Sequence, residues 1–226
     1  MPSPQSKRAS RRPPRRREAR PLGRVKQSYT QSARDLASRS VGGLQHTRVS
    51  PNALTTAGVA LCLAASVVVV FENRNPDLFY WLAALLFVVG SVLDILDGAL
   101  ARTSNKATPF GAFLDSTTDR VGEGAMLCAI GLIFARHGNT AALACAFAAV
   151  IGSFLVSYTR AKAEALGLRG DVGIGSRAER VIVITAGLAL APWGLLQWAI
   201  YLLTATAWIT VGQRILSVRT QLRKQR

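Results

Sequence analysis

Four aspartates occupy a stretch of the chain that is otherwise apolar enough to enter a membrane. Asp94 and Asp97 lie three residues apart, and Asp115 and Asp119 lie four residues apart, so each pair falls on one face of a helix. Four carboxylates that face one another in a poorly solvated place repel each other and take up protons. Two hard cations, Mg²⁺ before Mn²⁺, would neutralise them and leave coordination positions for phosphate oxygens. The spacing therefore predicts a two-cation site with all four aspartates as ligands.

A purely structural role for these aspartates is the alternative. They could cap helices or form interfacial ion pairs with Arg102, Lys106 and Arg120. That account suits any one of them, but four on consecutive apolar segments favour function, because ionisable residues inside membrane segments usually serve one. Gly98 and Gly111, each beside an aspartate pair, would let a bulky ligand or a neighbouring helix approach the backbone.

Six apolar segments must position these residues. Each approaches the roughly 20 residues that a helix needs to cross the hydrocarbon layer. We therefore predict an all-α polytopic membrane protein with six transmembrane helices. The fifth segment is the shortest, and residues 191–194 must supply the turn that follows it. The segments cover residues 52–71, 78–100, 110–135, 140–163, 179–196 and 197–217.

The basic residues alternate between the links that join these segments. The chain has 28 Lys and Arg and a net charge of +16, yet the links after the first, third and fifth segments hold only Arg74 and Arg136. Loops rich in Lys and Arg stay in the cytoplasm. The charge pattern therefore predicts that both termini and the aspartates face the cytoplasm.

The N-terminal region differs in composition from the rest. Residues 1–24 are rich in Arg and Pro without an apolar face, which is typical of a disordered basic tail. Residues 25–45 have a modest apolar face and are predicted to form an amphipathic helix at the cytoplasmic interface, leaving residues 46–226 as the membrane domain. A basic tail can bind nucleic acid or anionic lipid. In a chain that enters the membrane we expect membrane lipids, and no nucleic acid.

The stretch from Asp94 to Asp119 resembles a known family. It matches the CDP-alcohol phosphotransferase signature DxxDGxxAR, eight residues, then GxxxDxxxD, at every fixed position. The resemblance implies an integral membrane enzyme with six transmembrane helices, usually a homodimer, here in a bacterial plasma membrane. Such an enzyme moves a phosphatidyl group from a CDP-linked lipid to an alcohol and releases CMP.

The resemblance also implies roles for individual residues. Three aspartates would hold the metal pair, and Asp119 would add a ligand and act as the general base, a role open to a carboxylate beside the reacting hydroxyl. The family often has an aspartate where Asn52 stands, so this position departs from its pattern. The implied metal ligands are Asp94, Asp97, Asp115 and Asp119, and the implied nucleotide or CDP-lipid contacts are Asn52, Thr55, Gly98, Arg102 and Thr108.

A second polar group lies further along the chain and bears on the alcohol acceptor. Arg160, Arg180 and Arg214 are all predicted on the aspartate side, and Arg214 interrupts an apolar stretch. Positive-inside charge alone would explain most of them. Convergent guanidinium groups beside a cation site nevertheless suggest a phosphate on the acceptor. Inositol phosphate and glycerol 3-phosphate both fit this requirement.

The surrounding pattern, SYxxAxAEAxGLRGD followed by ER, resembles the actinobacterial phosphatidylinositol phosphate synthases. That resemblance implies transfer from CDP-diacylglycerol to inositol 1-phosphate, with Ser157, Arg160, Arg180 and Arg214 lining the acceptor pocket. A phosphatidylglycerophosphate synthase that uses glycerol 3-phosphate is the alternative within the family.

A divalent-cation or proton-coupled transporter is the alternative from another class, because transporters also bury acids in membrane helices. Two features count against it. The acids lie at the cytoplasmic interface rather than at the midplane, and discontinuous half-helices are not evident in the sequence.

Overall fold

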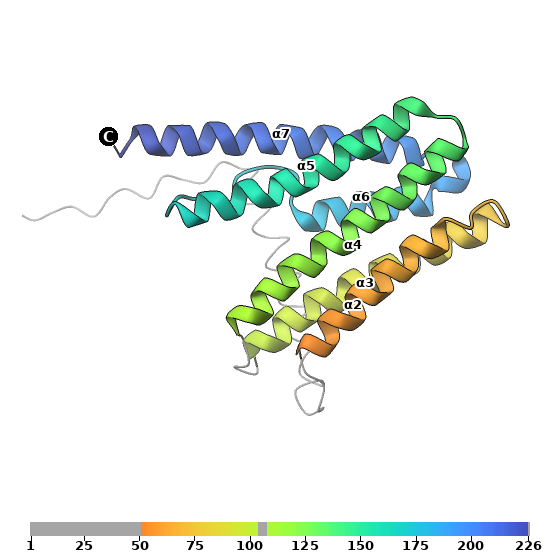
Figure 1. Ribbon diagram of the computed structural model, residues 1–226, viewed down its shortest axis with the longest axis horizontal. Helices are drawn as coiled ribbons and strands as arrows, with labels where there is room; N and C mark the ends of the chain where they lie inside the picture. The colour runs from red at the N-terminus through yellow and green to blue at the C-terminus, as the bar shows by residue number, and fades with distance from the viewer. Residues whose placement is uncertain (1–50, 104–107, 226) are drawn as a thin grey trace, which may run out of the picture.

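The computed structural model describes residues 51–103 and 108–225, and within them every regular element is helical. The predicted basic tail and amphipathic helix lie outside these residues. Figure 1 shows the helices in order along the chain. They are α2 (Pro51–Val69), α3 (Pro76–Thr103), α4 (Pro109–Arg136), α5 (Thr140–Ala165), α6 (Arg177–Ala189), the short 3₁₀ helix η1 (Ala191–Trp193) and α7 (Leu196–Arg223).

The helices begin where the sequence provides start signals. Pro51, Pro76 and Pro109 are the first residues of α2, α3 and α4, where the fixed φ of proline suits the helix and its missing N–H is not needed. Thr108 caps α4 by accepting a hydrogen bond of 3.0 Å from the backbone N–H of Gly111. These caps set the register of the two helices that carry the aspartates.

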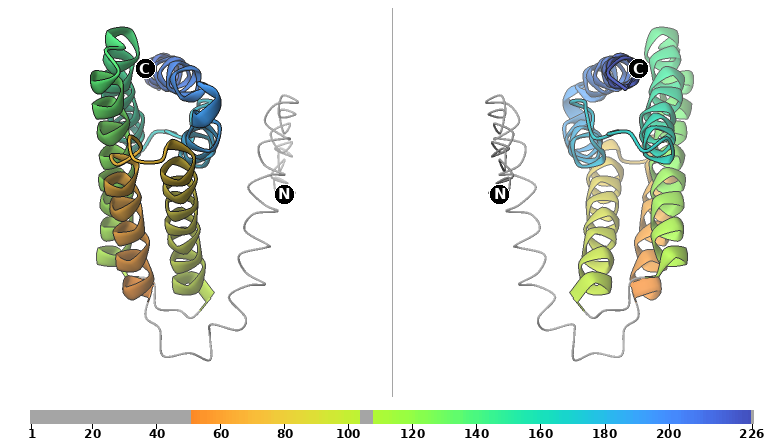
Figure 2. Two further views of the ribbon diagram at one scale, coloured as in Figure 1. Left: turned by 90° about the vertical axis from the view of Figure 1, so that its right-hand side faces the viewer. Right: turned by 90° about the vertical axis from the view of Figure 1, so that its left-hand side faces the viewer.

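The two aspartate-bearing helices touch each other only slightly. α2 packs against both α3 and α4, while α6 packs against α3 and α7, and α5 lies between α4 and α7. Figure 2 shows α3 standing apart from α4 in both views. The main apolar core draws on all six α-helices and lies at the end of the bundle away from the aspartates. The aspartate-bearing ends of α3 and α4 are therefore not packed directly together, and a ligand or a side chain from another helix can lie between them.

Glycine allows a close crossing of the backbones of α2 and α3. A Cβ on Gly58 would lie 2.8 Å from the carbonyl oxygen of Gly90, and a Cβ on Gly90 would lie 2.7 Å from that of Gly58. One turn away, a Cβ on Gly122 of α4 would lie 3.0 Å from the Cβ of Cys62. Asp94 follows Gly90 by one turn of α3, so this crossing fixes the height at which Asp94 enters the site.

Four helices are long and apolar enough to cross a membrane by length and composition, namely α2, α3, α5 and α7. Large apolar side chains are exposed along the bundle, among them Phe113, Phe147 and Ile182. Large apolar side chains exposed in such number on long apolar helices suit contact with lipid rather than with water. The architecture is therefore that of an all-helical integral membrane protein.

The predicted fifth and third segments differ from the other four. α6 ends at Ala189, and a 3₁₀ turn with Gly194 at φ 75° separates it from α7. Its 13 residues give a length of about 20 Å, below the roughly 30 Å of the hydrocarbon layer. The turn predicted at residues 191–194 is confirmed, and because Pro192 and Gly194 lie in it, the helix ends before the predicted segment bound of residue 196. α4 has the length, but its several charged residues keep it outside the apolar set.

Candidate active site

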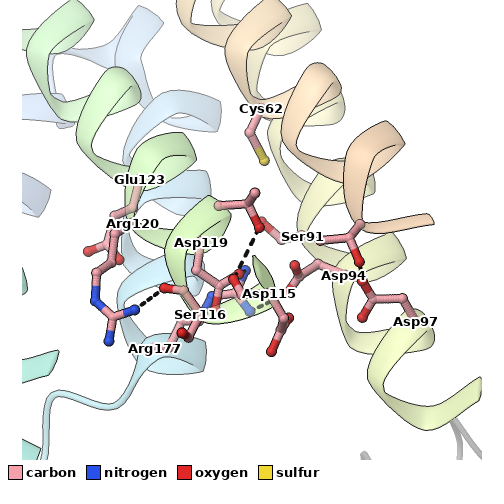
Figure 3. A network of polar contacts seen from close by, with 12 residues as sticks. Cys62, Ser91, Asp94, Asp97, Asp115, Ser116, Asp119, Arg120, Glu123 and Arg177 are labelled. Atoms are coloured by element: carbon pink, nitrogen blue, oxygen red, sulfur yellow. Dashed lines mark hydrogen bonds and ion pairs between the residues drawn. The ribbon is translucent and has the colours of Figure 1, made fainter. Parts of the chain in front are cut away.

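Three of the four predicted aspartates converge. Asp94 and Asp97 on α3 and Asp115 on α4 each offer a carboxylate oxygen, and these oxygens lie within 4.8 Å of one another. Asp94 and Asp97 are buried, Asp97 with only 2% of its surface exposed, and Asp115 is half-buried. Asp119 lies one turn further along α4, beside this group rather than within it (Figure 3).

A third helix of the site, α2, helps to fix the most enclosed carboxylate. The hydroxyl of Thr55 donates a hydrogen bond to Oδ2 of Asp97, and both side chains are buried. Oδ1 of Asp97 has no hydrogen-bond partner among the described residues. A buried carboxylate oxygen without a partner is costly, so this atom requires a donor or a cation.

An arginine that the sequence analysis did not select bridges two of the aspartates. Nη1 of Arg177 donates to Oδ2 of Asp94, and Nη2 forms an ion pair with Oδ1 of Asp119 that lacks hydrogen-bond geometry (Figure 3). Arg177 is the first residue of α6. The pattern Ser176-x-x-Glu179 is a capping box, a sequence signal for a helix that begins at Arg177. In the structure the backbone N–H of Ser176 donates to Glu179, as this motif requires.

Of the three basic partners that the structural alternative named, the structure describes the side chain of Arg120. Arg120 donates to the backbone oxygen of Ser116 instead of to an aspartate. The side chain of Arg102, in the last turn of α3, and the whole of Lys106 lie outside the described residues. Within the described part of the chain, Arg177 forms ion pairs with Asp94 and Asp119.

This donor set fits a divalent metal. Hard cations such as Mg²⁺ and Mn²⁺ prefer carboxylate oxygens, and three carboxylates from two helices converge here. Oδ1 of Asp97, which accepts no hydrogen bond from the described residues, is an atom that a bound cation would satisfy. The aspartate cluster is thus a candidate metal centre.

The residues predicted to contact the nucleotide gather on the same side. Asn52 and Thr108 come together around Gly111, since a Cβ on that glycine would lie 3.1 Å from Oγ1 of Thr108 and 3.6 Å from Oδ1 of Asn52. Thr55 instead contacts Asp97, as described above. Gly98 is half-buried beside the cluster on α3. α2 and α4 therefore bring two of these residues to one place.

The residues predicted to bind the acceptor lie nearby, with their guanidinium groups engaged by the protein. Arg180 is 4% exposed and pairs with Glu123 of α4 through contacts of 2.6 and 2.8 Å, and its third contact is the oxygen of Gly175 at 3.0 Å. The sequence analysis missed Glu123. The bidentate geometry makes this pair a structural clamp between α4 and α6.

The other acceptor candidates have lighter contacts. Arg214 donates to the backbone oxygens of Val172, at 2.8 Å, and of Val156. Arg160 is exposed and forms an ion pair of 2.9 Å with Glu164 on its own helix. Ser157 is half-buried on α5. These side chains lie around the loop between α5 and α6, which is also held by Gln221 of α7 through bonds to Arg169.

Helices suited to a membrane, with a carboxylate cluster at one end, define an integral membrane protein with a candidate metal centre. A family model described as CDP-alcohol phosphatidyltransferase matches residues 48–217. The chain belongs to this family and is therefore a phospholipid-synthesising transferase. Family membership decides for the enzyme over the transporter.

Individual relatives carry more specific names. An archaetidylinositol phosphate synthase from Pyrococcus horikoshii is 34% identical over 200 residues, which cover 88% of this chain and 95% of that protein. The crystal structure of Mycobacterium tuberculosis phosphatidylinositol phosphate synthase (PgsA1) with CDP-DAG bound has a TM-score of 0.71 and 29% identity, and the match covers 81% of this chain and 94% of that chain. The same enzyme in complex with manganese and citrate has a TM-score of 0.72 and 30% identity, over 81% and 89% of the two chains.

Proposed function

We propose that this protein transfers the phosphatidyl group of CDP-diacylglycerol to inositol 1-phosphate, giving phosphatidylinositol phosphate and CMP. The observation that carries the proposal is the convergence of Asp94, Asp97 and Asp115 next to a loop surrounded by arginines. The first feature suits a metal-bound diphosphate and the second suits an acceptor with its own phosphate. The family and the names of the relatives support the same reaction.

The proposed site holds two divalent cations, Mg²⁺ or Mn²⁺, on the four aspartates. Bound there, they would neutralise the diphosphate and the charge that develops on the leaving CMP. The M. tuberculosis enzyme has been crystallised with manganese, which supports this cofactor class.

The chain's own residues position the reactants. Thr55 holds Asp97 in place, and Asp119 stands next to the carboxylate group, where it can accept the proton of the attacking inositol hydroxyl. The oxygen of the inositol hydroxyl forms the new bond to the lipid-side phosphorus. The bond between that phosphorus and the oxygen of CMP breaks, and its electron pair leaves with CMP. Positioning therefore accounts for most of what the protein contributes.

The acceptor assignment rests on the arginines and on two relatives. The names of the archaeal and the mycobacterial relative both describe products that contain inositol phosphate, although the lipid parts of these products differ. Ser157, Arg160, Arg180 and Arg214 are the proposed acceptor-binding residues. Glycerol 3-phosphate remains the second candidate, because it also carries a phosphate.

We further propose that the helices from α2 to α7 cross a bacterial plasma membrane as six spans, the fifth made of α6 together with η1, with both termini and the site in the cytoplasm. The distribution of Lys and Arg supports this orientation. Assembly as a homodimer is proposed from the family resemblance.

Release of CMP from CDP-diacylglycerol by the purified full-length protein in lipid nanodiscs tests the function. We expect release that requires Mg²⁺ or Mn²⁺ and inositol 1-phosphate, and that stops when EDTA removes the metal. CMP release with glycerol 3-phosphate alone would replace the acceptor assignment. No release with either acceptor would overturn the proposed reaction.

A further inference from the structure

Arg177 divides the four aspartates into two overlapping sets. Asp94, Asp97 and Asp115 form the group that can share a cation, whereas Asp94 and Asp119 share the guanidinium of Arg177. Asp94 belongs to both sets. Its carboxylate therefore takes part both in the candidate metal centre and in the ion pair with Arg177.

The backbone of Arg177 is held firmly, although its side chain reaches into the site. Three residues further along α6, Arg180 is clamped to Glu123 of α4. Just before Arg177, the N–H of Gly175 donates to Thr210 of α7 at 2.8 Å. The side chain of Arg177 is still 34% exposed. A fixed backbone and a long, partly solvated side chain allow the guanidinium to exchange partners without movement of the helix.

A guanidinium and a divalent cation compete for the carboxylate of Asp94. Both are cations, and Asp94 belongs both to the candidate metal centre and to the ion pair with Arg177. Held a few ångströms apart in a poorly solvated place, the two positive charges repel each other. Metal binding at this centre should therefore weaken the contacts of Arg177, and the contacts of Arg177 should weaken metal binding.

We propose that Arg177 is an exchangeable counter-ion of the carboxylate centre, which a divalent cation displaces and which then binds the phosphate of the acceptor. The inference rests on the proposed function, because that function supplies the phosphate. Arg177 lies one helical turn from Arg180, at the end of the loop that Arg214 holds. A guanidinium released from the aspartates is thus beside the proposed acceptor residues, and it favours bidentate contact with phosphate.

Thermodynamic linkage makes this exchange measurable as cooperativity. If the acceptor phosphate takes Arg177 away from the aspartates, the acceptor must raise the affinity for the metal, and the metal must raise the affinity for the acceptor by the same factor. Coupling of this kind is typically about 5-fold to 150-fold.

The first arm of the test measures Mn²⁺ binding to the full chain in nanodiscs, with the free ion detected by electron paramagnetic resonance. Arg177→Gln should bind Mn²⁺ at least about 5-fold more tightly than the unsubstituted protein. Arg219→Gln removes the same charge from an exposed position on α7 and should leave the affinity unchanged. Equal or weaker Mn²⁺ binding by Arg177→Gln overturns the proposal.

The second arm repeats the titration with inositol 1-phosphate present. The unsubstituted protein and Arg219→Gln should gain Mn²⁺ affinity, and Arg177→Gln should gain little. Complexes of Mn²⁺ with the free phosphate ester affect all samples equally. Arg177→Lys keeps the charge but lacks the planar guanidinium that can pair with two carboxylates at once. We therefore expect an intermediate gain in Mn²⁺ affinity on addition of inositol 1-phosphate. A full gain in Arg177→Gln, or none in the unsubstituted protein, contradicts the exchange.

Failure of this inference is distinguishable from failure of the function. A protein that makes phosphatidylinositol phosphate without the predicted coupling refutes the role of Arg177 alone. A protein that binds no Mn²⁺ and releases no CMP refutes the proposed reaction itself.

Discussion

Asp119 differs from the other three aspartates in its surroundings. Its Oδ1 faces Arg177, and within the described residues this buried oxygen accepts no hydrogen bond. Asp94, Asp97 and Asp115 form a group without it. A carboxylate at the edge of such a group is better placed to exchange a proton with a bound hydroxyl than one enclosed among cation ligands, and this supports its proposed role as base.

Replacing Asp119 with asparagine preserves the size of the side chain and removes its ability to take a proton. We expect Asp119→Asn to lower kcat by about 10²-fold to 10⁴-fold, the usual contribution of a general base. Binding of CDP-diacylglycerol, followed separately by ligand-induced thermal stabilisation, should be largely retained. Near-normal turnover in this variant would remove Asp119 from the base role.

Arg180 was predicted to bind the acceptor, and the structure shows that it also stabilises the fold through its pair with Glu123. Arg180 was selected as an acceptor residue, and the structure places it in a buried ion pair. Breaking a buried pair by removing one partner costs about 3–5 kcal/mol, because the other charge is left uncompensated. Glu123→Gln should lower the free energy of unfolding by about this amount.

Arg180→Ala should cause a similar loss of stability and also raise the KM for inositol 1-phosphate, whereas Glu123→Gln should affect KM less. Unfolding titrations in detergent and steady-state kinetics measure the two effects. Glu164→Gln is the matched control, because its pair with Arg160 is exposed and should contribute less than about 1 kcal/mol. An unchanged KM in Arg180→Ala would leave this arginine with a structural role only.

The sequence predicted the aspartates more readily than their partners, and the reason is physical. A carboxylate in an apolar helix is conspicuous, because it is costly there without a function. Arg177 follows Gly175 and Ser176 in a polar loop, where an arginine is ordinary, whereas Glu123 lies inside the apolar segment 110–135 and could have been selected on the same ground as the aspartates. Only the packing of α6 against α3 shows which of several basic residues reaches the cluster.

At the scale of the helices, the contact between Gly58 and Gly90 sets the geometry of the site. The backbones of α2 and α3 approach so closely there that neither glycine has room for a methyl group. Thr55 precedes the crossing on α2 and Asp94 follows it on α3. The distance between Thr55 and Asp97 therefore depends on the backbones remaining in contact.

Gly90→Ala should push α2 and α3 apart, because the added Cβ would lie 2.7 Å from a backbone oxygen that cannot move alone. We expect a loss of about 1–3 kcal/mol in stability, as for overpacked cores, together with weaker Mn²⁺ binding. Thermal unfolding in detergent and the Mn²⁺ titration measure both. Gly212→Ala, whose Cβ would meet nothing within 4 Å, is the control and should gain up to about 1 kcal/mol from the higher helix propensity of alanine. Equal stability of the two variants would show that the crossing is not tight.

The helices themselves were largely predictable, and α6 shows the limit. Apolar length located α2, α3, α4, α5 and α7, and Pro109 and Thr108 marked the start of α4. The turn predicted at residues 191–194 is present as η1 and Gly194, but the apolar residues on both sides of it left the end of α6 at Ala189 unmarked in the sequence. The slight contact between α3 and α4 was also unexpected, since consecutive helices usually pack together.

For the whole molecule, the asymmetry of charge gives an orientation that can be measured. The turn after α2 lies at the opposite end of the bundle from the aspartates, and the loop after α5 lies at the aspartate end. Asn73→Cys and Arg169→Cys place a thiol at an exposed position in each. In intact cells, a membrane-impermeant maleimide should label the first variant and not the second.

Inside-out vesicles should reverse this pattern, and the unsubstituted chain reports any labelling of Cys62, Cys128 and Cys145. The opposite pattern would place the aspartates outside the cytoplasm, away from a supply of CDP-linked lipid on the inner face, and would contradict the proposed topology.

The length of α7 ties the site to the thickness of the bilayer. Its 28 residues extend about 42 Å, whereas the hydrocarbon layer is about 30 Å thick. The part of α7 that exceeds this thickness includes the turn in which the side chain of Gln221 forms hydrogen bonds to the backbone of Arg169, in the loop after α5. A helix that is too long for its membrane responds by tilting. Tilt of α7 would carry that loop, and the arginines around it, relative to the aspartates on α3 and α4. Acyl-chain length in the surrounding lipid should therefore change the KM for inositol 1-phosphate more than it changes the affinity for Mn²⁺.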